Sequence, residues 1–146
     1  MRKPMRVLGL FLLLSSFASA QETKPALRTG YYPVPVAASR QPNPVKATPE
    51  SIADGKKIFG YDCAQCHGAA GDGKTEVGQD LKAADFTDPT TLKDRTDGAI
   101  FYILKNGHGN MPREGDRVKP EQLWDLVNYV RSLARKPAPA EPKPSK

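Results

Sequence analysis

The chain has 146 residues, a formal net charge of +6 and two cysteines. This length suits one small domain. The basic surplus lies near the ends, because residues 48–134 hold eleven Lys or Arg against fourteen Asp or Glu, a net charge of −3. That region has no basic stripe interleaved with aromatic residues, so the composition argues against a nucleic-acid-binding protein.

Residues 1–20 have the pattern of a secretory signal peptide. Three basic residues precede an apolar run from Val7 to Leu14, and the small residues Ala18-Ser19-Ala20 offer a cleavage site before Gln21. The apolar run is much shorter than the ~20 residues that cross a bilayer. We therefore expect an exported, periplasmic protein with no integral membrane span. A lipid anchor is not expected, since Gln21 stands where a lipidated cysteine would be required.

Two proline-rich segments border the central region. Residues 21–47 contain five prolines and residues 137–146 contain four, and both segments show little apolar periodicity. Such composition favours extended, poorly packed chain. We expect a proline-rich linker or arm at 21–47, one domain at 48–136, and a disordered Pro/Lys-rich tail at 137–146.

The first helix of the domain is predicted from its start signal. Thr48 is suited to the N-cap and Pro49 to the first helical position, and the helix is expected to end near Gly60. Gly55 and Phe59 lie on the face expected to turn inward. A glycine inside a helix is destabilising unless another backbone needs the space, so Gly55 indicates a close approach.

Cys63-Ala64-Gln65-Cys66-His67 matches C-x-x-C-H, the spacing that attaches haem covalently. Cys63 and Cys66 can each add across a haem vinyl group, and His67 can bind the iron as an axial ligand. The alternatives are a thioredoxin-like dithiol and half of a zinc ribbon. A zinc ribbon needs a second ligand pair, and the chain has no other cysteine. The motif therefore favours one covalently attached haem c with its iron, which would also give the small domain an apolar body to pack around.

The stretch from Gly68 to Lys93 is expected to be loop with at most one helical turn, and two further helices are predicted after it. A middle helix is expected at residues 97–106, ending at Gly107. The last helix is expected to begin after Pro120. Its apolar residues recur at the helical period, as expected for a core-facing stripe: Leu123, Leu126, Val127, Val130, Leu133 and Ala134.

The loop between these helices carries Met111, the only methionine beyond the signal segment. Its thioether can coordinate iron from the side opposite His67, and His/Met ligation raises the reduction potential. His108 is the competing ligand and would give a haem of lower potential. We favour Met111 and interpret His108 as a surface histidine, so the predicted metal ligands are His67 and Met111. Phe86 and Phe101 are candidates for lining the haem pocket.

These residues make the chain similar to the class I c-type cytochromes of the short bacterial single-haem kind. The similarity runs from Thr48 to about Arg135 and rests on the haem-attachment motif and on the methionine loop. It implies an all-α fold, a cytochrome c-like small helical domain wrapped around one covalently bound haem. It also implies a contact between Gly55 and Phe59 of the first helix and Tyr129 of the last.

The chain departs from the family pattern on the proximal side of the haem. Many family members have a proline soon after the motif, and its carbonyl accepts a hydrogen bond from the proximal histidine. No proline lies between His67 and Pro89 in this chain. Another backbone carbonyl within residues 78–86 is therefore expected to accept the hydrogen bond from His67.

The resemblance implies an electron carrier that is not itself an enzyme. We expect a periplasmic mono-haem cytochrome that carries single electrons between redox partner proteins. The alternative is a haem-bearing subunit of a membrane respiratory or dehydrogenase complex, with residues 21–47 as an interaction arm. A third function, an enzyme or gas sensor, would require an open coordination position on the iron.

Overall fold

The structure is a computed structural model that describes residues 32–134. The predicted signal peptide, the beginning of segment 21–47 and the tail at 137–146 lie outside the described residues. The described part is helical, which confirms the predicted all-α class. Its elements are α1 (Val36–Ser39), α2 (Pro49–Ile58), the π-helical turn η1 (Phe59–Cys63), α3 (Ala64–His67), α4 (Glu76–Leu81), α5 (Asp97–Asn106) and α6 (Pro120–Ser132).

Helix α2 begins as the sequence predicts, but the helical path does not end near Gly60. The Thr48 side chain caps the helix by accepting a hydrogen bond from the Ser51 N–H, and Pro49 is the first helical residue. After Ile58 the chain continues through η1 directly into α3. Single π-helical turns occur often at functional sites. Here the turn carries the first cysteine of the motif, so α2 and the haem-attachment segment form one continuous helical unit.

The contact between α2 and α6 depends on Gly55. A Cβ atom at this position would lie 2.2 Å from the Asp125 carbonyl oxygen and 2.8 Å from the Tyr129 Cβ, so only glycine allows this approach. One turn later the Phe59 ring packs edge-on against the Tyr129 ring, with centroids 5.2 Å apart. The predicted helix contact is confirmed.

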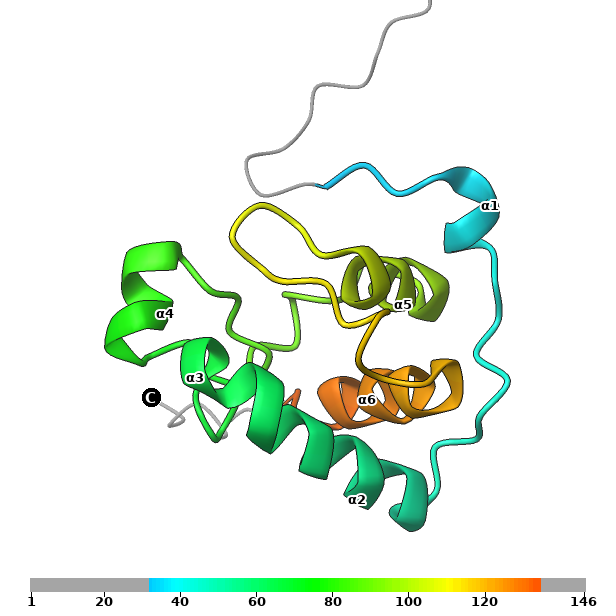
Figure 1. Cartoon of the computed structure of the whole chain (residues 1–146), viewed down its shortest axis with the longest axis horizontal. Helices are drawn as coiled ribbons and strands as arrows, with labels where there is room; N and C mark the ends of the chain where they lie inside the picture. Colours follow the sequence, from blue (N-terminus) through cyan, green and yellow to red (C-terminus); the bar gives the residue numbers. More distant parts are fainter. Residues whose placement is uncertain (1–31, 135–146) are drawn as a thin grey trace, which may run out of the picture. The chain divides into compact units, whose positions relative to one another are not determined.

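The core lies between α2, α5 and α6, which Figure 1 shows grouped together. The Phe101 ring stacks on Trp124 of α6 with centroids 4.0 Å apart. The stripe predicted for α6 supplies much of this core, although Leu133 is only partly buried. The buried cluster comprises Phe59, Ile100, Phe101, Leu104, Leu123, Trp124, Leu126, Val127, Tyr129 and Val130. None of the helices at residues 32–134 is long and apolar enough to span a membrane.

Residues 32–47 pack along the helices, unlike the poorly packed arm that their proline content predicted. Figure 1 shows this segment running past α5 toward the start of α2. The Thr96 hydroxyl donates to the Ser39 carbonyl at 2.6 Å. At Gly98 a Cβ would lie 2.3 Å from the Ala38 carbonyl oxygen, so the two backbones are in direct contact.

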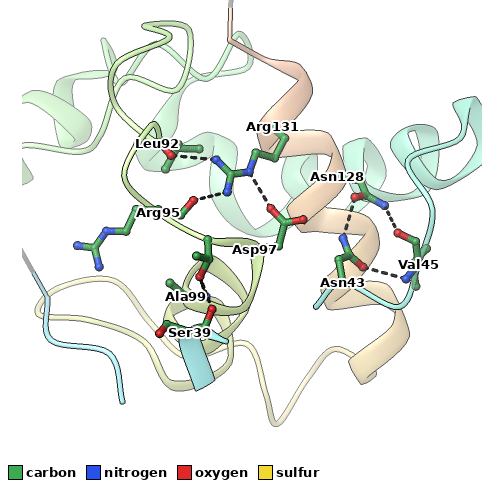
Figure 2. Close-up of polar contacts among 10 residues, drawn as sticks. Ser39, Asn43, Val45, Leu92, Arg95, Asp97, Ala99, Asn128 and Arg131 are labelled. Carbon is green, nitrogen blue, oxygen red and sulfur yellow. Dashed lines mark hydrogen bonds and ion pairs between the residues drawn. The ribbon is translucent and has the colours of Figure 1, made fainter. Parts of the chain in front are cut away.

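A buried amide network attaches the end of this segment to α6 (Figure 2). Asn43 Nδ2 donates to Asn128 Oδ1 at 2.8 Å, and Asn128 Nδ2 donates to the Val45 carbonyl at 3.2 Å. The Asn128 amide also donates to the Ser51 hydroxyl of α2 at 2.8 Å. The segment therefore supplies hydrogen bonds that a buried asparagine of α6 needs.

Arg131 attaches α6 to the segment before α5 (Figure 2). Its Nε donates to Asp97 Oδ1 at 2.9 Å and its Nη1 donates to the Leu92 carbonyl at 2.9 Å, while its Nη2 donates to the Arg95 carbonyl. One guanidinium thus fixes the chain that leads from the middle loop into α5.

Gly55→Ala should lower the free energy of unfolding by about 1–3 kcal/mol, because the added methyl group overlaps the Asp125 carbonyl and forces α2 away from α6. Gly60→Ala is the matched control, since a Cβ added at Gly60 would meet nothing within 4 Å. Guanidinium unfolding of the two holoproteins measures the difference. Equal midpoints for both variants would contradict the close contact.

Asn43→Ala should lower the free energy of unfolding by about 1–3 kcal/mol, because it leaves the side-chain Oδ1 of the buried Asn128 without its donor. Gln41→Ala is the control, since Gln41 is exposed and meets Gly98 through its backbone. Thermal unfolding checks both variants. If Asn43→Ala unfolds at the wild-type temperature, residues 32–47 do not stabilise the domain.

Candidate haem site

The haem-attachment motif lies at the end of η1 and in α3. Cys63 closes η1, and Cys66 and His67 lie in α3. Both thiols are free and partly buried. Burial, with the nearby carboxylates of Glu114 and Asp62, raises the pKa of Cys63 to about 12. A redox-active dithiol needs a thiolate of lowered pKa, so this environment disfavours the thioredoxin-like alternative.

The His67 ring is oriented by one hydrogen bond. Its Nδ1 lies 3.1 Å from the Ala84 carbonyl oxygen, and because a carbonyl can only accept, Nδ1 carries the proton. In the neutral ring Nε2 then keeps its lone pair for a metal. Burial lowers the pKa of His67, against the effect of the Ala84 hydrogen bond, and so favours this neutral form. Ala84 supplies the carbonyl that the sequence predicted only as lying within residues 78–86.

Two phenylalanine rings border the His67 imidazole. Phe86 stacks on it with ring centroids 4.6 Å apart, and Phe59 lies on the core side with centroids 6.4 Å apart. Phe86 therefore lies beside the candidate iron ligand His67. Phe101 instead stacks on Trp124 in the core.

A short helix that sequence analysis did not resolve supports the motif. The Thr75 hydroxyl donates to the Cys66 carbonyl at 3.0 Å and accepts from the Gly78 N–H at 2.8 Å, which caps α4. A Cβ at Gly78 would lie 2.1 Å from the Cys66 carbonyl oxygen. Thr75 followed by Glu76 is an N-cap signal that could have located this helix.

The methionine loop is closed by a two-residue turn. His108 N–H donates to the Met111 carbonyl at 3.0 Å, and Met111 N–H donates back to the His108 carbonyl at 2.8 Å. Gly107 precedes this turn with a φ of +74°, and a Cβ there would lie 2.7 Å from the Met111 carbonyl oxygen. Glycine is therefore required at this position both for the backbone angle and for space.

The two candidate distal ligands lie in different surroundings. Met111 is partly buried and packs against the core cluster, as Cys63 also does. His108 is exposed, and its ring lies 4.3 Å from the ring of Tyr32. These positions favour Met111 as the distal ligand and agree with a surface role for His108.

The donor set fits haem. An imidazole whose Nε2 can bind a metal, two thiols and a thioether come from three segments that all border one apolar core. Within residues 32–134 no group of three or more His, Cys, Asp or Glu side chains could hold a metal ion, whereas a zinc ribbon needs four such ligands.

The sequence matches a known family over residues 50–130, more than half of the chain, and this family is described as cytochrome c oxidase, cbb3-type, subunit III. Cytochrome c6 of Pyropia tenera is 35% identical over 85 residues, which cover 58% of this chain and 95% of that protein. The cbb3-type cytochrome c oxidase subunit FixP of Rhizobium etli is 34% identical over 90 residues, which cover 59% of this chain and 30% of FixP.

The fold is similar to that of a solved c-type cytochrome. The KustC0563 c-type cytochrome superposes with a TM-score of 0.53 and 29% sequence identity, covering 56% of this chain and 99% of that one. The family match, the relatives and the fold agree with the resemblance seen in the sequence. The chain therefore belongs to the c-type cytochromes, as a class I domain of the family described for the cbb3-type subunit, and its cofactor is covalently attached haem c with its iron.

Proposed function

We propose that this protein is a periplasmic mono-haem cytochrome that carries single electrons between redox partner proteins and is not itself an enzyme. The observation that carries the proposal is the pair of candidate axial ligands. His67 is oriented by Ala84, and Met111 is held against the core. With both axial positions taken by the chain, no position on the iron is left for a substrate.

The chain's own residues would hold the cofactor as follows. The Cys63 and Cys66 thiols would hold the haem through two thioether bonds, each made by adding S–H across a vinyl group. His67 Nε2 and the Met111 sulfur would bind its iron. Bound haem supplies a reversible one-electron change at its iron. Phe59 and Phe86 limit the access of water to the His67 side.

Two observations bear on whether the protein is a freely diffusing carrier or a subunit of a larger complex. The Pyropia cytochrome c6 consists almost entirely of the region matched here, which favours a free single-haem carrier. The family description and the FixP match favour the second candidate, a haem-bearing subunit of a membrane respiratory or dehydrogenase complex. Purification from the native membrane and periplasmic fractions separates them. Recovery only in a stable membrane complex would favour the subunit.

The periplasmic location rests on the signal-peptide pattern of residues 1–20. The N-terminal residue of the mature holoprotein tests it. A chain beginning at Gln21 in the periplasmic fraction would agree with the proposal, and an uncleaved chain in the cytoplasm would contradict it.

Acid-acetone extraction should leave the haem on the polypeptide, because two thioether bonds survive this treatment. Cys63→Ala combined with Cys66→Ala should abolish stable holoprotein, and the chain should be poorly folded without its central apolar group. Absorbance of the precipitated protein measures the retained haem. Clean extraction of haem from the wild type would contradict covalent attachment.

Met111→Ala should lower the reduction potential by on the order of 0.1 V, a fraction of the roughly 0.8 V range that axial ligands span. It should also let carbon monoxide reach the ferrous iron. His108→Ala is the matched control from the same turn and should leave both properties near wild type. Potentiometry and carbon monoxide difference spectra make the comparison, and the reverse pattern would identify His108 as the ligand.

A further inference from the structure

A buried carboxylate follows the methionine loop, and the proposed ligand set gives it no role. The Glu114 side chain is 3% exposed. Arg117 Nη2 donates to Glu114 Oε1 at 2.6 Å and to Oε2 at 2.7 Å. A buried carboxylate is costly unless it is paired, so the position of Glu114 depends on this guanidinium.

The same guanidinium reaches the haem-attachment segment. Arg117 Nη1 lies 3.7 Å from Asp62 Oδ1, and Asp62 directly precedes Cys63 in η1. Arg117 therefore joins two carboxylates that are 52 positions apart in the sequence. One belongs to the segment that carries the first haem thiol, and the other lies three residues after Met111. We name Asp62, Arg117 and Glu114 the clasp.

Backbone hydrogen bonds attach the chain that follows the methionine loop, where the clasp begins, to α5. Glu114 N–H donates to the Leu104 carbonyl at 2.9 Å and Gly115 N–H donates to the Lys105 carbonyl at 3.1 Å. The end of the loop is thereby attached to the last turn of α5. All three charges of the clasp also act on the Cys63 thiol, the carboxylates raising its pKa and Arg117 lowering it, so the clasp lies close to the attachment cysteine.

We propose that the clasp positions the Met111 loop against the haem-attachment segment and so keeps the methionine sulfur at the iron. Asp62, Arg117 and Glu114 are positioning residues, since they act through the loop and do not bind the iron. The inference rests on the proposed ligation by Met111. It assigns to three charged side chains a part in retaining the distal ligand.

The test measures how readily an added ligand displaces the methionine. Imidazole is the probe, because it binds ferric haem iron only after the Met111 sulfur leaves. Asp62→Asn should raise the apparent affinity for imidazole about threefold, the change that ~0.7 kcal/mol of lost positioning would produce. Arg117→Met should raise it by at least as much, because it also leaves the buried Glu114 unpaired. In the Arg117→Met protein, adding Asp62→Asn should have little further effect, because both changes break the same contact.

Arg113→Met is the matched control. Arg113 lies in the same loop, and its ion pair with Asp116, 2.7 Å long and exposed on both sides, does not reach η1. This variant should bind imidazole as the wild type does. Helical circular dichroism and guanidinium unfolding of each holoprotein show whether the fold is intact. Asp62→Asn leaves the Glu114 pair in place, so it decides the result if Arg117→Met does not fold.

The outcomes separate the clasp from the ligand assignment. Suppose that wild-type ferric protein shows the methionine-to-iron charge-transfer band and that Asp62→Asn binds imidazole no more tightly than Arg113→Met. The proposed role of the clasp would then be wrong, while ligation by Met111 would stand. A wild type without that band would overturn the ligation by Met111 and the clasp with it. The band in the wild type and a rise in imidazole affinity confined to the clasp variants would support the proposal.

Discussion

The contact of α2 with α6 at Gly55 is the constraint on which the haem site depends. Because the helix backbones touch there, α2 has one position on the core, and the Phe59 ring follows against Tyr129. Helix α2 continues without a break through η1 into α3. A single glycine therefore sets where Cys63 and His67 lie relative to α6, and the close packing of a protein core leaves little room for adjustment.

The parts of the fold predicted from sequence are those with local signals. Thr48 and Pro49 mark the start of α2, and the apolar stripe of α6 has the helical period. The predicted end of the first helix near Gly60 agrees with the end of α2 at Ile58, but the continuation of the helical path through η1 was not predicted. Helix α4 was anticipated only as one helical turn without a position. It is a short capped helix whose Gly78 lies against the Cys66 carbonyl, and apolar periodicity does not indicate such a contact.

The haem site was predictable as far as side-chain chemistry identifies it. The C-x-x-C-H motif and the single downstream methionine identify the candidate haem-binding side chains directly. The hydrogen-bond acceptor for His67, in contrast, is a backbone carbonyl, and every residue carries one. Only the path of the chain selects Ala84. The same limit applies to residues 32–47, where the bond between Asn43 and Asn128 joins positions 85 apart. The proline content of residues 32–47 does not indicate that Asn43 bonds to Asn128.

The two sides of the proposed haem site differ in how they are held. On the proximal side, the hydrogen bonds are local in sequence. The His67 ring bonds to the Ala84 carbonyl, 17 positions away, and the carbonyl of the neighbouring Cys66 accepts a hydrogen bond from Thr75. On the distal side, the Met111 turn has its own bridge and Gly107 and packs on the core, and the exposed Arg117 adds an ion pair to the attachment segment. Exposed ion pairs are weak and screened by salt, whereas a buried carboxylate cannot readily lose its partner. The buried Glu114 therefore gives Arg117 a fixed position, and this explains how a surface arginine can contribute to the geometry of the site.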